Sequence, residues 1–308
     1  MRFENRLQNQ ITIYLENPSD MIHPVPPPNS FHTFDYQFDL RSRHPDFQQY
    51  FDRNDLLSTE AIEALPCQLD IPYGDHALQA IDYFPAKQGN APIVIFIHGG
   101  YWRTLDKHNY SFIAPPFIDE GCAVCSINYR LAPEIGLKAI VDDVIKALHS
   151  IREHATAING NPNDLYVTGH SAGGHLALMS AMLLQEDKNP LLCSIKGILS
   201  LSGLFDLDPI RKSFLNEILN LDDSATRRFS PILKENFSVD IPLRFAVGRG
   251  ETDEFIRQSQ AIDERMTANG NNSQSEILPE LNHFDIVYEL GKPDGVLTKQ
   301  LLEIIHRT

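Results

Sequence analysis

The chain has 308 residues, of which 42% are hydrophobic and 22% are charged, a composition typical of a globular protein with a buried core. Its formal net charge of −15 argues against nucleic-acid binding, because contacts to phosphate backbones need clustered Lys and Arg. No apolar run reaches the roughly 18 residues of a membrane span, and the first residues lack the apolar core of a signal peptide. We therefore expect a soluble, cytoplasmic protein that makes no contact with membranes.

Residues 1–34 are interpreted as an extension, because the stretch 23–30 is rich in proline and cannot form a helix or a central strand. It could be an ordered arm or a flexible tail, and the sequence does not decide between them. Residues 35–308 are expected to form a single domain. Near its start, the stretch 58–65 resembles a short capped helix.

From Cys67 onward, predicted strands and helices alternate. Strands are expected at 67–74, 77–84, 92–97, 122–128, 164–169, 196–203, 241–248 and 275–278, with helices at 137–155, 172–185 and 253–270. The first two strands flank a turn at Gly74 and should be antiparallel. The alternation of the remaining strands with helices predicts an α/β fold, with a mostly parallel central sheet and helices on both faces. Between 204 and 236 the pattern loosens, so we expect a cap or insertion over the carboxyl edge of the sheet.

Two of the four cysteines, Cys122 and Cys125, have the C-x-x-C spacing found in some metal sites. They lie within a predicted buried strand, where positions three apart point to opposite faces. No second Cys or His pair with ligand spacing lies nearby. We therefore interpret them as core residues and expect no metal. So few cysteines in a chain of this length suit a reducing compartment.

The sequence Gly169-His170-Ser171-Ala172-Gly173 fits G-x-S-x-G, with a predicted strand before it and a predicted helix after it. Small flanking residues permit the strained turn that exposes a serine nucleophile. The alternative is a glycine-rich turn with an incidental serine. The strand–turn–helix context favours the nucleophile, with the Ala172 N–H beside it to stabilise developing negative charge.

A serine hydroxyl needs a base, and enzymes built on this turn carry their triad in the order Ser, acid, His. His283 follows the last predicted strand and is the favoured base, whereas His175 lies on the helix after the serine and His306 near the end of the chain. Three carboxylates follow the predicted strand at 241–248, which comes before the last one: those of Glu251, Asp253 and Glu254. The last two fit the first turn of a helix, where acidic residues favour the helix dipole. We therefore favour Glu251 over Asp253 as the triad acid.

The stretch Phe96–Arg103, FIHGGYWR, follows the apolar strand at 92–97 and supplies an H-G-G segment. Such a segment offers backbone N–H groups to an oxyanion hole. We assign the donors to the amides of Gly100 and Tyr101 together with Ala172, and expect His98 to brace the loop. The aromatic pair Tyr101 and Trp102 either narrows the acyl side of the substrate pocket or serves only in packing.

Together these motifs resemble the α/β-hydrolase superfamily, on the H-G-G branch that includes esterases similar to hormone-sensitive lipase. The stretch NYRLAPE at 128–134 is also similar to that branch. The H-G-G-Y-W and GHSAGG motifs, with SGLFDLDPI at 202–210, are closer to the kynurenine formamidase (arylformamidase) group. The resemblance covers about 35–290. It places Glu251 at the acid position, although glutamate departs from the commoner aspartate.

The resemblance implies a serine hydrolase that acts on a small-molecule substrate without a cofactor. An arylformamidase reaction in tryptophan catabolism, releasing formate from N-formylkynurenine, is the expected activity. A broad short-chain carboxylesterase is the alternative, and a non-catalytic binding protein is a more remote one. The sequence leaves open the physiological substrate and whether the chain forms a homodimer.

Overall fold

A central sheet organises the protein in the computed structural model, which describes residues 33–307. These residues form eight strands in the order β1-β2-β4-β3-β5-β6-β7-β8. The strands are β1 (Gln68–Pro72), β2 (Ala80–Phe84), β3 (Ala91–Ile97), β4 (Ala123–Ile127), β5 (Gly160–His170), β6 (Ile195–Leu201), β7 (Leu243–Gly248) and β8 (Ser273–Leu278). β1 pairs antiparallel with β2 and β2 with β4, while all pairs from β4 to β8 are parallel. The predicted mostly parallel α/β sheet is confirmed.

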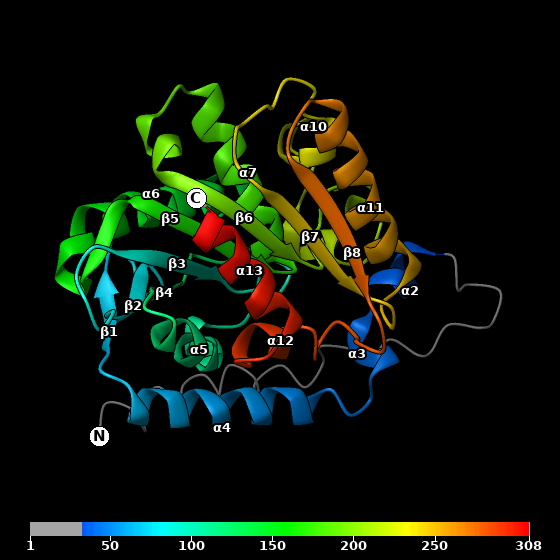
Figure 1. The fold of residues 1–308 in the computed structure, drawn as a ribbon. Coiled ribbons are helices and arrows are strands. Elements are labelled where there is room, and N and C mark those ends of the chain that lie inside the picture. Colours follow the sequence, from blue (N-terminus) through cyan, green and yellow to red (C-terminus); the bar gives the residue numbers. More distant parts are fainter. Residues whose placement is uncertain (1–32, 308) are drawn as a thin grey trace.

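Helices cover both faces of this sheet, as Figure 1 shows. The longer ones are α4 (Gln48–Ala64), α5 (Ala114–Asp119), α6 (Leu137–His154), α7 (Ala172–Glu186), α10 (Asp223–Phe229), α11 (Asp253–Ala268) and α13 (Val296–Arg307). The short ones are α2 (Phe34–Phe38), α3 (Leu40–Arg43), α8 (Asp208–Arg211), α9 (Asn216–Leu219) and α12 (Tyr288–Gly291). α6, α7 and α11 contribute to the core on one face, and α5, α12 and α13 to the core on the other. Within residues 33–307, no helix combines the length and apolar character needed to cross a membrane.

Alternating side chains of the strands divide between the two cores, as the two-residue period of a strand requires. In β3, Ile93 and Ile95 face the core under α6 and α7, while Val94 and Phe96 face the core under α5 and α13. Cys125 and Cys122 likewise belong to opposite cores and are both buried, which confirms their interpretation as core cysteines.

The helix predicted at 58–65 is too short, because α4 begins ten residues earlier, at Gln48. Its first half is polar and aromatic and carries no strong periodic signal. Tertiary contacts stabilise it instead: the ring of Tyr50 stacks on Phe284 with centroids 5.4 Å apart, and the Tyr50 hydroxyl accepts a hydrogen bond from Asn282 at 3.0 Å. Of the predicted extension 1–34, residues 1–32 lie outside the described residues.

Candidate active site

Ser171 lies at the junction of β5 and α7, in a strained backbone conformation with φ 57° and ψ −120°. Its N–H donates to the carbonyl of Leu201 at the end of β6, 2.7 Å away, which fixes the turn against the neighbouring strand. Only glycine fits at 173, since a Cβ there would lie 2.0 Å from the Ile97 carbonyl oxygen. The sequence thus allows α7 to begin directly against the ends of the strands and to present Ser171 to a cavity.

His283 and Glu251 lie side by side in the loops that follow β8 and β7. His283 Nδ1 is 2.6 Å from Glu251 Oε2, and the two residues are 4% and 7% exposed. The other carboxylate oxygen, Oε1, accepts hydrogen bonds from Ser202 Oγ at 2.5 Å and from the Gly248 N–H at 2.8 Å. One oxygen is therefore fixed by two donors, and the other is directed at the imidazole.

The two other carboxylates in this stretch lie elsewhere. Asp253 is exposed in the first turn of α11. Glu254 is buried and pairs with Arg257, with nitrogen and oxygen 2.5 Å apart, and accepts a hydrogen bond from Gln258 at 3.0 Å. Glu251 thus has the contact expected of a triad acid.

The H-G-G segment passes directly over the serine turn. A Cβ on Gly99 would lie only 3.0 Å from Ser171 Cβ, so glycine leaves room for this close approach. The next three residues, Gly100, Tyr101 and Trp102, all have positive φ, of 95°, 49° and 59°. Gly100 and Tyr101 line the same cavity as Ser171. Ala172 opens α7, where the first N–H groups have no partner within the helix.

Tyr101 and Trp102 separate into different environments. Tyr101 lines the cavity and donates its hydroxyl to the Phe38 carbonyl at 3.0 Å. Trp102 is fully buried, with its ring edge-on to His175 at 5.0 Å between centroids. His175 Nε2 in turn donates to the Phe229 carbonyl at 2.8 Å, so both rings pack in the interior. This arrangement favours the packing role for Trp102.

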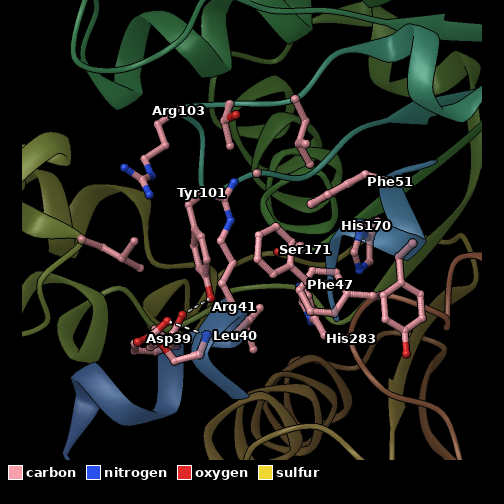
Figure 2. Close-up of a pocket in the computed structure, with 18 of the residues that line it drawn as sticks. Asp39, Leu40, Arg41, Phe47, Phe51, Tyr101, Arg103, His170, Ser171 and His283 are labelled. Carbon is pink, nitrogen blue, oxygen red and sulfur yellow. Dashed lines mark hydrogen bonds between the residues drawn. The ribbon is translucent and has the colours of Figure 1, made fainter. Parts of the chain in front are cut away.

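The cavity has a volume of about 450 Å³, and ten of its lining residues lie between Phe38 and Asn54. Residues 33–54 are named here the N-terminal lid. The lid comprises α2, α3 and the start of α4 (Figure 1). Figure 2 labels Asp39, Leu40, Arg41, Phe47 and Phe51 of the lid among the residues that line the cavity with Ser171 and His283. The lid supplies these lining residues: Phe38, Asp39, Leu40, Arg41, Ser42, Pro45, Phe47, Tyr50, Phe51 and Asn54. Another part is lined by Phe214, Leu215, Glu217 and Ile218, from the predicted insertion.

Hydrogen bonds attach the lid to the body of the protein. Gln37 Oε1 accepts from the Glu254 N–H at 3.0 Å, and Asp35 Oδ1 accepts from the Phe214 N–H at 2.6 Å. The patterns in the sequence did not predict this element. The signal available was its concentration of aromatic residues, at Phe34, Tyr36, Phe38, Phe47, Tyr50 and Phe51.

Charged side chains lie at specific points of the otherwise aromatic cavity. Arg41 and Arg103 line it, as do Asp39 and Glu217. The Arg41 guanidinium lies 5.1 Å from the centre of the Phe47 ring. Among residues 33–307, no carboxylate forms an ion pair with Arg41 within 4.0 Å.

His170 lies against His283, with ring centroids 4.6 Å apart, and also lines the cavity. Burial and the neighbouring His283 hold the pKa of His170 well below its ordinary value, so it stays neutral. A neutral ring avoids charge repulsion when His283 gains a proton. In the described part of the chain, no group of three or more His, Cys, Asp or Glu side chains could hold a metal ion.

Comparisons with known proteins agree with this architecture. The BD-FAE family profile matches residues 81–232. A kynurenine formamidase from Danio rerio is 33% identical over 250 residues, covering 78% of this chain and 82% of that protein. The carboxylesterase NlhH from Mycobacterium tuberculosis is 36% identical over 110 residues, covering 35% of this chain and 34% of that protein. An esterase structure from Pyrobaculum calidifontis has a TM-score of 0.69 at 16% identity, covering 88% of this chain and 94% of that one, and shares the fold.

Proposed function

This chain belongs to the kynurenine formamidase family of α/β-hydrolases, and we propose that it is a serine hydrolase whose preferred reaction is the removal of a formyl group from an aryl formamide. That it is a hydrolase follows from the family. The observation that supports the serine mechanism is the convergence of three groups: Ser171 on its strained turn, His283 lining the same cavity, and the Glu251 carboxylate 2.6 Å from His283 Nδ1.

In the proposed reaction, Ser171 Oγ attacks the formamide carbonyl carbon while His283 Nε2 takes its proton. Glu251 accepts the Nδ1–H hydrogen bond, which selects the tautomer with Nε2 free and stabilises the imidazolium. Collapse of the tetrahedral intermediate breaks the C–N bond, and His283 gives the proton to the departing amine. Water, deprotonated by His283, then hydrolyses the formyl ester on Ser171 to release formate.

The oxyanion of both tetrahedral intermediates is assigned to the amides of Gly100, Tyr101 and Ala172. Losing one such donor costs comparable enzymes about 3–4 kcal/mol of transition-state stabilisation. The N–H of Ala172 also lies at the positive end of the α7 dipole, which favours a developing negative charge. No metal or organic cofactor takes part in the proposed mechanism.

For the substrate, we propose N-formyl-L-kynurenine, an aryl formamide with an amino-acid side chain. The aromatic lining and the volume of about 450 Å³ suit a single substituted ring. Arg41, which stacks on Phe47 and forms no ion pair with a described carboxylate, supplies a charge for the substrate carboxylate. Tyr101 borders the acyl end, and Trp102 packs behind it.

A broad short-chain carboxylesterase is the second candidate, because the same catalytic groups would hydrolyse acetyl or butyryl esters. It would not need Arg41. A non-catalytic binding protein is a third candidate, although Ser171 and His283 are both present. Labelling of Ser171 by a fluorophosphonate tests this third possibility, and an unlabelled folded protein would refute the serine mechanism.

The decisive experiment compares hydrolysis of N-formyl-L-kynurenine with that of p-nitrophenyl acetate, using Ser171→Ala as the control. Turnover of the formamide that is lost in Ser171→Ala is the expected result, and it would place the protein in tryptophan catabolism. Turnover of the ester alone would keep the mechanism but assign the protein to small-acyl esterases.

A further inference from the structure

The oxyanion segment is held in a conformation that the chain would not adopt unaided. Tyr101 and Trp102 both have left-handed φ, at 49° and 59°, which costs a non-glycine residue energy that the surroundings must offset. If the segment relaxed, the N–H groups assigned to the oxyanion would turn away from Ser171. Contacts outside the segment must therefore fix its peptide planes.

Within the segment, His98 Nδ1 lies 2.9 Å from the Gly99 carbonyl oxygen. Further contacts, from outside the segment, come from the loop after β4. The Tyr129 hydroxyl lies within hydrogen-bond distance of two carbonyl oxygens, those of His98 at 2.9 Å and Gly99 at 3.1 Å. The Tyr129 ring stacks on the His98 ring, with centroids 4.4 Å apart and planes 10° from parallel. At the other end, the Ala132 N–H donates to the Trp102 carbonyl at 2.9 Å.

Because the peptide bond is planar, the contact between the Tyr129 hydroxyl and the Gly99 carbonyl also fixes the direction of the Gly100 N–H. The carbonyl of Gly99 and the N–H of Gly100 belong to one planar trans peptide and point in opposite directions. A hydrogen bond that holds the carbonyl on one side of the segment therefore holds the Gly100 N–H on the other. Gly100 lines the cavity with Ser171, whereas Tyr129 is fully buried behind the segment.

We propose that Tyr129 is a positioning residue of this hydrolase: by sharing its single O–H proton between the His98 and Gly99 carbonyls, it aims the Gly100 N–H at the oxyanion. This inference rests on the proposed function, because Tyr129 acts only through the oxyanion hole that the proposed function assigns. Tyr129 does not touch the substrate.

The loop that carries Tyr129 is itself rigidly held. The Asn128 amide donates to Asp106 Oδ2 at 2.8 Å, and its oxygen accepts from the Lys107 N–H at 2.7 Å. Burial also raises the pKa of Tyr129 well above its ordinary value, so the hydroxyl keeps its proton.

The test compares Tyr129→Phe with Tyr73→Phe. Each variant loses one buried hydroxyl that donates to a carbonyl of the same region, which for Tyr73 is the Asn128 carbonyl at 2.7 Å. Only the Tyr129 hydroxyl contacts the oxyanion segment. We expect Tyr129→Phe to lower kcat about tenfold for both p-nitrophenyl acetate and N-formyl-L-kynurenine, less than the loss of a whole oxyanion donor. KM should change less than twofold, and Tyr73→Phe should keep kcat within about twofold.

A second readout separates positioning from a general structural effect. A trifluoromethyl ketone adds to Ser171 Oγ and forms an oxyanion, so its affinity should fall in Tyr129→Phe by the same factor as kcat/KM. Rates and affinities are expressed per active site titrated with a fluorophosphonate, so that an unfolded fraction does not contribute. The pH at which kcat is half-maximal should not move, because His283 and Glu251 are untouched.

Two results would overturn the proposal: Tyr129→Phe with normal kcat and normal ketone affinity, or equal losses in both variants after titration. Failure of the proposed function would give a result distinct from these two. In that case the unmodified protein would hydrolyse neither substrate and would not react with the fluorophosphonate.

Discussion

Replacing Glu251 by Gln tests the acid assignment, and the structure determines how the new amide would orient. The oxygen at the Oε1 position accepts from the Gly248 N–H, which can only donate, and from Ser202 Oγ. The amide oxygen should keep this place, so the NH₂ group faces His283 Nδ1, 2.6 Å away in the native pair. Nδ1 would then have to accept a hydrogen bond, and the proton would move to Nε2.

An imidazole protonated at Nε2 cannot take the proton of Ser171. We therefore expect Glu251→Gln to lower kcat about 10⁴-fold, equivalent to about 5.5 kcal/mol in the activation free energy, as when other triads are forced into the wrong tautomer. Fluorophosphonate labelling of Ser171 should slow in parallel. KM should change little, because Glu251 does not line the cavity.

The assay is steady-state hydrolysis of N-formyl-L-kynurenine and p-nitrophenyl acetate, with thermal unfolding as a check on folding. Asp253→Asn is the matched control, since Asp253 is exposed and lies two residues away. It should keep kcat within about threefold and lose only a few tenths of a kcal/mol of helix-dipole stabilisation. A large loss of kcat in Asp253→Asn with a mild effect of Glu251→Gln would refute the assignment.

Two further predictions concern specificity and stability. Arg41→Met keeps an unbranched side chain but removes the guanidinium that lies over Phe47. KM for N-formyl-L-kynurenine should therefore rise about tenfold, while KM for p-nitrophenyl acetate stays unchanged; equal KM changes for both substrates would contradict a carboxylate contact. Burial lowers the pKa of His175 to about 4, so below its unfolded value of about 6.5 the unfolded chain binds a proton that the folded protein does not. Stability from this group is present above pH 6.5 and is lost as pH falls toward 4, by up to about 3 kcal/mol. In urea titrations between pH 7 and 4.5, His175→Gln should therefore lose less stability than the native chain, and parallel curves would argue against a buried neutral imidazole.

The sequence predicted the parallel sheet well because each strand from β3 to β7 contains a short, mostly apolar run, which in β5 follows a polar first half. It also predicted the contact between Glu251 and His283, because Asp253 and Glu254 had a separate explanation at the start of α11. The N-terminal lid could not be predicted in the same way. α2 and α3 have five and four residues, too few for a periodic pattern, and the bond from the Glu254 N–H to Gln37 joins positions 217 residues apart.

The different environments of Tyr101 and Trp102 also depend on information that local sequence patterns lack. Both residues adopt left-handed φ, a conformation that their side chains do not favour. Hydrogen bonds from the loop after β4 hold the segment in this conformation. They reach the Gly99 carbonyl and the Trp102 carbonyl. Prediction from sequence therefore pointed to the H-G-G segment, which does line the cavity with Ser171, but not to which of its two aromatic residues faces that cavity.

The order of the strands in space explains how these parts work together. From β4 through β3, β5, β6, β7 to β8, the loops at the carboxyl ends carry Tyr129, Gly100, Ser171, Ser202, Glu251 and His283 in that order. Neighbouring strands lie about 4.8 Å apart, so the sheet itself sets the spacing of the proposed catalytic groups. The lid contributes to the cavity from outside this sheet. Changes in the lid should therefore alter which substrate binds, whereas changes at the strand ends should alter the rate of the chemical step for every substrate.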